Sequence, residues 1–271
     1  MTIGHWNRRQ FLGTTLTASV VAVGARAAPA FGSTSTIHRF LLVQSTALPI
    51  DAAHIESDLK RNLERMLQII EQHASPNDWI AFDDAPLTGH VTTALPAKTL
   101  ALSDSDLQTL AIAATRKKFW ISFGAIRRER DSIIAISPQG KIHEWAMPSR
   151  YAPLPLEANM VESSSTLPIV EFDSHKLALI PVDATETTLA QCAERGIDIV
   201  ITMGSGAQCT LAPTHPLSPS LLMHVQAASP WQPPGCHAEG LSRSRAINGR
   251  GEVIAECPNA GDQLLVLDRR S

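Results

Sequence analysis

The segment KLALIPVDATETTLAQCAERGIDIVIT, residues 176–202, decides the fold that the sequence predicts. Residues 177–180 form an uninterrupted apolar run, which is typical of a strand buried on both faces. Residues 197–201, IDIVI, predict a second buried strand. Gly196 can end the helix-length stretch between them, because glycine readily adopts the left-handed conformation found after helices. The segment therefore predicts a strand, a tight turn, a helix and a second strand.

The turn after the first of these strands carries Pro181, which has no nucleophilic atom. Asp183 or Thr185 can cap the helix that follows, since a side-chain oxygen there can accept a hydrogen bond from a backbone N–H of the first turn. Strand-to-helix corners of this kind often hold the nucleophile of an α/β enzyme. Proline fixes φ and removes a backbone donor. The sequence therefore predicts a strand-to-helix corner that lacks a nucleophile.

The N-terminus has the pattern of an export signal. Residues 7–12, NRRQFL, form a twin-arginine pattern, an uncharged run continues through residue 25, and small residues at 25–30 offer cleavage sites. We therefore expect residues 1–30 to be a twin-arginine signal peptide. Residues 37–271 are expected to form one domain, located in the periplasm or secreted.

The composition is that of a globular domain. The 271 residues are 44% hydrophobic and 18% charged, and removal of residues 1–30 leaves 20 basic and 26 acidic residues, a net charge of −6. Without a basic run, the domain is not expected to bind nucleic acid or an acidic lipid surface. Beyond the leader, no stretch has the length of a membrane span.

Four cysteines permit three disulfide pairings in an exported chain. Cys192 falls on the apolar face of the helix described above, which favours a buried free thiol. Cys209 and Cys236, together with His215 and His237, match no common metal-site spacing. We expect neither a metal nor a cofactor.

The rest of the chain alternates further strands with two helices. Apolar residues at helical spacing predict a helix over 56–73, and Ser103 with Asp106 forms a capping-box-like pair that begins a second helix ending near 117. Alternating or apolar runs between turn signals predict strands over 37–44, 78–82, 119–125, 132–137, 141–145, 168–172, 221–227, 242–247, 252–256 and 264–268.

Several motifs, in order, resemble the nitrilase, or carbon–nitrogen hydrolase, superfamily. NLE at 62–64 is similar to a first-helix motif, FDDAPLTG at 82–89 to F-P-E-x-x-x-T-G, and LALIPVD at 177–183 to the nucleophile elbow. SIIAISPQGKI at 132–142 and SRAINGRGEVIAE at 244–256 resemble two hairpins of the family. The resemblance implies an α/β fold, a four-layer α-β-β-α sandwich, and a homodimer.

The resemblance also implies a Glu-Lys-Cys triad, in which a thiolate attacks the amide or nitrile carbon, a glutamate moves the proton and a lysine stabilises the oxyanion. Here the glutamate position falls at Asp84, the lysine position at Pro148 and the cysteine position at Pro181. Aspartate retains the carboxylate but is about 1 Å shorter. Neither proline supplies a functional group.

Neighbouring residues complete the candidate site. Arg150 is the nearby candidate for a replacement cation, and Asp183 follows the elbow. His90 follows the FDDAPLTG motif and either lines the pocket or lies on a surface loop. Asp83 and Asp84 can perturb each other's protonation or bind a cation, although two solvated acids beside a turn are the commoner arrangement.

These observations favour an exported nitrilase-like protein that has lost amide and nitrile hydrolysis and binds a small amide-like or other polar ligand, or a protein partner. The alternative is an active carbon–nitrogen hydrolase with a shifted nucleophile, Asp84 as base and Arg150 as cation. A third possibility is a structural remnant that binds no ligand.

Overall fold

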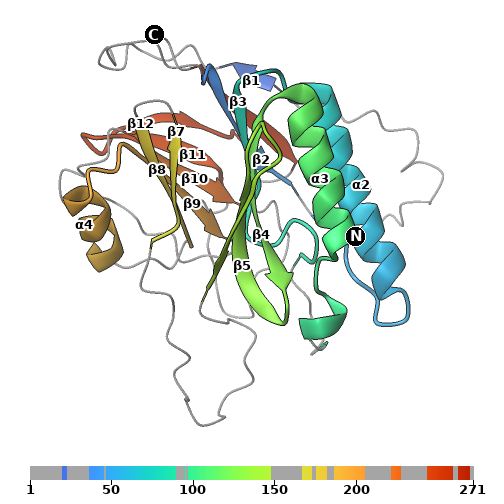
Figure 1. Cartoon of the computed structure of the whole chain (residues 1–271). Coiled ribbons are helices and arrows are strands. Elements are labelled where there is room, and N and C mark those ends of the chain that lie inside the picture. The colour runs from blue at the N-terminus through green and yellow to red at the C-terminus, as the bar shows by residue number, and fades with distance from the viewer. Residues whose placement is uncertain are drawn as a thin grey trace, which may run out of the picture.

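A computed structural model describes residues 20–22, 37–45, 47–89, 95, 97–147, 167–172, 175–181, 186–204, 221–226, 243–258 and 262–268. Two β-sheets face each other, with helices on their outer faces (Figure 1). The seven-stranded sheet has the order β1-β13-β2-β3-β4-β5-β6, and the six-stranded sheet has the order β12-β11-β10-β9-β8-β7.

In the first sheet, β2, β3 and β4 run parallel, and β5 and β6 continue as antiparallel neighbours. Its strands are β1 (Val20–Ala22), β2 (Arg39–Gln44), β3 (Asp78–Ala81), β4 (Trp120–Arg127), β5 (Arg130–Ile136), β6 (Ile142–Ala146) and β13 (Gln263–Asp268).

In the second sheet, β8, β9 and β10 run parallel. Its strands are β7 (Ile169–Phe172), β8 (His175–Pro181), β9 (Ile199–Gly204), β10 (Leu221–Gln226), β11 (Arg245–Asn248) and β12 (Val253–Glu256). The helical elements are α2 (Ile55–His73), the short 3₁₀ helix η1 (Ala97–Thr99), α3 (Asp104–Lys117) and α4 (Glu186–Glu194).

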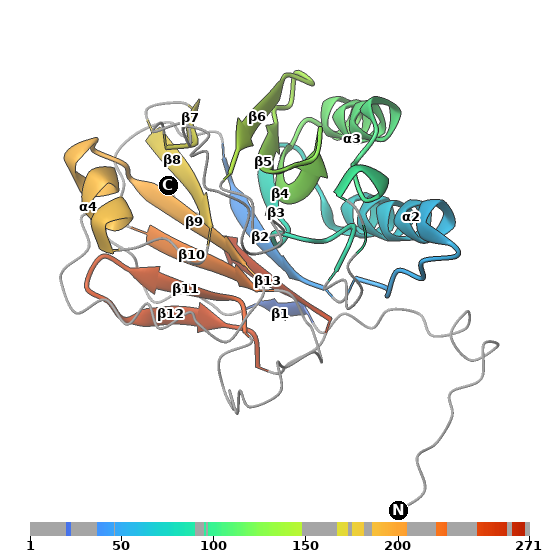
Figure 2. The ribbon, with the colours of Figure 1, turned by 90° about the horizontal axis from the view of Figure 1, so that it is seen from below.

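Three apolar layers hold these four layers of secondary structure together. The first lies between α2, α3 and the first sheet, and includes Met66, Leu110 and Phe123. The second lies between the two sheets, and the third packs α4 against the second sheet through Leu189 and Cys192. Figure 2 shows the helices on opposite sides of the paired sheets. This is the α-β-β-α sandwich that the sequence predicted.

The two strands and the helix predicted within 176–202 are confirmed, while the turn at 182–185 lies outside the described residues. Leu177–Ile180 is fully buried within β8, and α4 and β9 follow. Gly196 has a φ of 63°, and the N–H of Ile197 donates to the carbonyl of Cys192 at 3.0 Å, which closes the helix end. The expected caps, Asp183 and Thr185, lie outside the described residues.

The predicted capping pair at the start of α3 is also confirmed. The Ser103 hydroxyl accepts from the N–H of Asp106 at 3.1 Å and donates to its carboxylate at 2.6 Å. Val20–Ala22, within the predicted leader, forms strand β1 and pairs in parallel with β13. In the described part of the chain, no helix is long and apolar enough to cross a membrane.

One buried amide fixes the loops that follow β2 and β3. Asn62 of α2 donates to the carbonyls of Leu48 at 3.0 Å and Leu87 at 2.7 Å, and its carbonyl accepts from the N–H of Leu48 at 2.8 Å. Asn62 is 1% exposed and its bond to the Leu87 carbonyl is buried, so that carbonyl depends on the Asn62 amide rather than on water. The amide therefore holds both loops against α2.

Replacing Asn62 by Ala should lower the free energy of unfolding by about 2–4 kcal/mol, because backbone groups of the half-buried Leu48 and the buried Leu87 lose their partners. Urea unfolding monitored by circular dichroism measures this loss. The exposed Gln68 on the same helix provides the control, and Gln68→Ala should change stability by less than about 0.5 kcal/mol. Equal losses in the two variants would refute the role of Asn62.

Candidate functional site

The candidate site begins with two carboxylates directly after β3. Asp83 is 1% exposed, whereas Asp84 is half-buried. One carboxylate oxygen of Asp83 accepts the N–H of Ala85 at 2.8 Å, and the Asp83 carbonyl accepts the N–H of Gly124 at 2.9 Å. Asp83 is therefore built into the end of the strand, and the picture of two solvated acids is wrong for this residue.

Burial raises the pKa of the Asp83 carboxyl well above its usual range, and the neighbouring carboxylate of Asp84 raises it further. The hydrogen bond from the N–H of Ala85 opposes this shift. Asp83 therefore holds its proton to higher pH than a solvated aspartate. The sequence predicted that each acid could change the protonation of the other. In the structure, Asp84 raises the pKa of Asp83 and so favours its neutral form.

The backbone of Asp84 lies directly against β4. A Cβ added at Gly124 would lie 2.3 Å from the Asp84 carbonyl oxygen and 2.5 Å from its Cα, closer than atoms can approach. Glycine is thus required here by close backbone approach. Together with the bond from Gly124 to Asp83, this contact fixes where the carboxylate pair leaves the sheet.

One hydrogen bond shows that the two sheets present their strand ends at the same pole. The N–H of Ser244 donates to the side-chain carbonyl of Gln44 at 2.7 Å, and both residues are fully buried. Gln44 ends β2, while Ser244 directly precedes β11, whose first residue, Arg245, pairs with His224 near the end of β10. The carboxyl ends of the parallel strands in both sheets therefore lie at one end of the sandwich.

Pro181 lies at this same end. It is the last residue of β8, is half-buried and pairs in register with Met203 of β9. The fold thus brings the carboxyl end of β3, which carries Asp83 and Asp84, and the carboxyl end of β8, which carries Pro181, to one pole of the sandwich. Four other candidates, Pro148, Arg150, His90 and Asp183, lie outside the described residues.

The described thiols are buried and weakly acidic. Cys192 and Cys257 are both free, as expected for Cys192. Burial raises the pKa of the Cys192 thiol to about 11 and that of the Cys257 thiol to about 12. A nucleophilic cysteine needs a thiolate near neutral pH, so neither thiol suits that role. Cys209 and Cys236 lie outside the described residues.

A polar pair that the sequence did not single out lies inside the second sheet. The Thr202 hydroxyl lies 2.8 Å from Nδ1 of His224, and both residues are buried. Their only sequence signal is a polar residue within an otherwise apolar strand. By strand alternation they lie on the side of the sheet that faces α4, away from the layer between the sheets. Within the described ranges, no cluster of His, Cys, Asp and Glu could hold a metal ion.

No protein-family model and no curated protein matches the sequence. Solved structures do match it. A mutant of the Nesterenkonia AN1 amidase from the nitrilase superfamily superposes with a TM-score of 0.62, covering 89% of this chain and 93% of that one at 16% identity. This chain has the fold of the nitrilase superfamily.

Two further structures of that amidase extend the comparison. A double mutant in complex with acrylamide gives a TM-score of 0.61 at 16% identity, covering 89% of this chain and 94% of that one. A mutant carrying the acetamide moiety of fluoroacetamide at its active-site cysteine gives a TM-score of 0.57 at 16% identity, with 89% and 93% covered. At this identity the likeness establishes the nitrilase fold and no more.

Replacing Asp83 by Asn should stabilise the protein increasingly as pH rises. A group whose pKa is raised by folding contributes most below its unfolded value and loses that contribution as pH rises through the folded value. Asn keeps the acceptor for the N–H of Ala85 and never ionises. The stability gain of Asp83→Asn should therefore grow as pH rises from about 4 upwards, beginning at the unfolded pKa of an aspartate.

Thermal unfolding across this pH range, with the exposed Glu64→Gln as control, measures the effect. A stability difference that stays constant with pH would contradict a raised pKa at Asp83.

Replacing Gly124 by Ala should push Asp84 away from β4 and destabilise the fold by about 2 kcal/mol or more, since backbone must move to admit the methyl group. The exposed Gly196 has no atom within 4 Å of an added Cβ and serves as the contrasting site. There the cost comes from positive φ alone and should be about 1 kcal/mol. Denaturant unfolding of the two variants compares these costs, and equal values would refute the close-approach argument.

Proposed function

We propose that this protein does not hydrolyse amides or nitriles and that its Asp83–Asp84 pair takes part in binding a small amide-like ligand. The observation that carries the proposal is Pro181 at the end of β8, where the sequence resemblance assigns the nucleophilic cysteine. Proline has no atom that can attack a carbonyl or nitrile carbon. β8 and α4 are both present, but the formation of an acyl-enzyme lacks its nucleophile.

The thiols of the described residues support this proposal. Cys192 lies in α4 and Cys257 follows β12, so neither is located in the corner after β8. Both have pKa values raised far above neutrality, which leaves them as unreactive thiols. The resemblance places the catalytic lysine at Pro148, and proline supplies no cation to stabilise an oxyanion.

The carboxylate pair supports the ligand class. An Asp83 that holds its proton can donate a hydrogen bond, and a carboxylate can accept one. A primary amide carries the matching carbonyl acceptor and N–H donor. The amidase of the same fold binds short amides such as acrylamide, and a ligand of this class agrees with the retained carboxylates here.

The twin-arginine pattern supports a location outside the cytoplasm, in the periplasm or secreted. The family resemblance supports a homodimer and no cofactor. A protein partner in place of a small ligand is the other binding role compatible with the loss of the nucleophile.

An active hydrolase with a shifted nucleophile is the competing function, because Asp84 retains the carboxylate that moves the proton in the family's reaction. In this alternative, Arg150 replaces the lysine cation.

The deciding experiment incubates the purified protein, cleaved of its leader, with short amides and nitriles and measures ammonia release. We expect no release above the buffer rate. Release that Asp84→Asn abolishes, and that the exposed control Glu64→Gln leaves intact, would overturn the proposal in favour of the hydrolase.

A thermal-shift titration with propionamide tests the binding half of the proposal. A ligand that binds the folded state alone raises the unfolding temperature as its concentration increases. We expect such a rise in the wild type and in Glu64→Gln, and its loss in Asp84→Asn. No rise at any concentration would exclude amide binding.

A further inference from the structure

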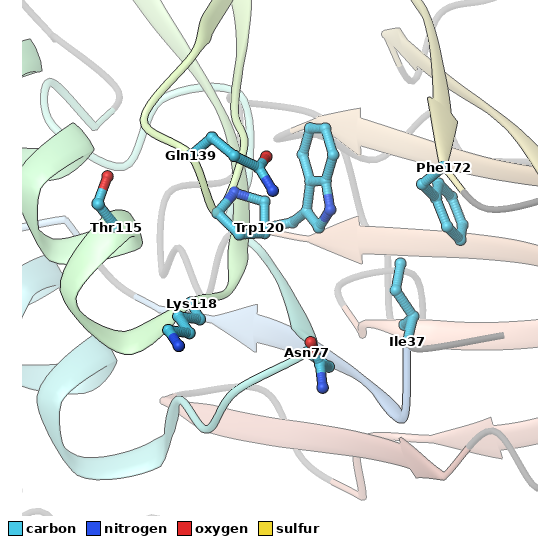
Figure 3. Close-up of a pocket in the computed structure, with 8 residues that line it drawn as sticks. Ile37, Asn77, Thr115, Lys118, Trp120, Gln139 and Phe172 are labelled. Atoms are coloured by element: carbon cyan, nitrogen blue, oxygen red, sulfur yellow. The ribbon is translucent and has the colours of Figure 1, made fainter.

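A cavity lies at the pole of the sandwich opposite to Asp83 and Asp84. Its volume is about 600 Å³, within the range of small-molecule sites. The lining comes from the amino ends of the parallel strands, since Ile37 precedes β2, Asn77 precedes β3 and Trp120 begins β4. Phe172 ends β7, which runs antiparallel to β8, and therefore lies at the same pole. In Figure 3 the rings of Trp120 and Phe172 lie above Ile37 in the view, and Lys118 and Thr115 lie on the side of Trp120 away from Phe172.

We propose that this cavity binds a planar aromatic carboxylate, with its ring against Trp120 and its carboxylate directed towards the ammonium group of Lys118. The site is separate from the carboxylate pair, and the inference does not depend on the proposed function.

The Trp120 ring is held in place from behind. It stacks on the fully buried Trp79 with ring centroids 5.0 Å apart and planes 9° apart. Trp79 is in turn fixed by a hydrogen bond from its indole N–H to the Ser122 hydroxyl at 3.0 Å. The ring centroids of Trp79 and Phe172 are 5.8 Å apart. Trp120 itself remains half-exposed. The His143 ring also lies near it, with centroids 6.2 Å apart and planes tilted by 36°. A rigid aromatic ring that keeps part of its surface exposed favours contact with a second flat ring.

The polar part of the lining is also rigid. The N–H of Asn77 donates to the carbonyl of Lys118 at 2.8 Å, and the N–H of His38 donates to the carbonyl of Asn77 at 3.0 Å. Asn77 and Lys118 both have left-handed backbones, with φ of 66° and 58°. These bonds tie the strand entrances to the end of α3, so the side-chain amide of Asn77 and the stem of Lys118 start from fixed positions.

The turn between β5 and β6 also lines the cavity, through Pro138 and Gln139. A Cβ at Gly140 would lie 2.7 Å from the Thr115 hydroxyl, so this turn packs closely on α3. The Ser137 hydroxyl accepts the N–H groups of Gln139 and Lys141, both at 3.2 Å. The turn thereby presents Gln139, whose amide points towards the Trp120 ring (Figure 3).

The charge of the lining favours an anion. Lys118 is exposed and forms no ion pair with the acids of the described residues, whereas the adjacent Lys117 lies 3.7 Å from Glu71 and donates to backbone carbonyls. Asp78, next to Asn77, is buried and already bonded to Arg39 at 2.6 Å and 3.0 Å. The amides of Asn77 and Gln139 supply further donors, and an aromatic wall with donors and one cation matches a flat anion.

Titration calorimetry with naphthoate on the full chain tests this proposal. Naphthylmethanol is the neutral comparison and decalin carboxylate the non-aromatic one. We expect naphthoate to bind about tenfold more tightly than either, since the first loses the charge contact and the second loses stacking. No measurable naphthoate binding, or equal binding of all three compounds, would overturn the proposal.

Variants of two exposed residues locate the site without disturbing the core. Gln139→Glu should weaken naphthoate about tenfold through like-charge repulsion and leave naphthylmethanol unchanged. Lys118→Gln should reduce naphthoate to the affinity of naphthylmethanol, whereas Lys60→Gln on the exposed face of α2 should have no effect. Unchanged naphthoate affinity in both Lys118→Gln and Gln139→Glu would refute the assignment.

Trp120→Leu tests the stacking wall and should weaken both aromatic compounds about tenfold. Trp145→Leu is its matched control, because Trp145 is also a half-exposed strand tryptophan but does not line the cavity. Asp84→Asn should leave naphthoate binding unchanged, which separates this site from the proposed amide site. Loss of naphthoate binding in Asp84→Asn would place the ligand at the wrong pole and refute the proposal.

Discussion

The structure depends on one constraint, the burial of both sheets on both faces. Along β3, Trp79 and Ala81 pack into the layer between the sheets while Ile80 packs towards α2 and α3. Along β8, Leu177 and Leu179 face the first sheet, and Ala178 and Ile180 face α4. A polar residue tolerated in either strand would therefore have to find a partner inside the protein. This is why the central parts of these strands read as apolar runs, and why buried polar residues within the second sheet, such as Thr202 and His224, lie within hydrogen-bonding distance of each other.

That constraint also explains how much of the fold the sequence could predict. Runs such as LALI at 177–180, the capping pair Ser103 and Asp106, and Gly196 after α4 are local signals, and each was confirmed. Local signals could not predict which strand ends share a pole, because the bond between Gln44 and Ser244 joins residues 200 positions apart. The same limit applies to Gly124, whose need for glycine comes from a backbone 40 residues earlier in the chain.

The candidate site divides in a similar way. The identity of Asp84 and Pro181 was readable from motif order, while the burial that raises the Asp83 pKa required the fold. From the sequence alone a solvated pair was the commoner expectation, since two adjacent acids carry no information on how deeply they are buried. Keeping one acid neutral costs less than burying two charges, and the N–H of Ala85 satisfies one of its oxygens.

The contact between Trp79 and Trp120 has a spectroscopic consequence. Two indoles with nearly parallel planes and centroids 5.0 Å apart are close enough for their excited states to couple. Trp79 belongs to the layer between the sheets, and Trp120 lines the cavity at the amino ends of the strands. The circular dichroism of this pair therefore reports on the packing of the two sheets and on the geometry of the cavity wall in a single signal, without any added label.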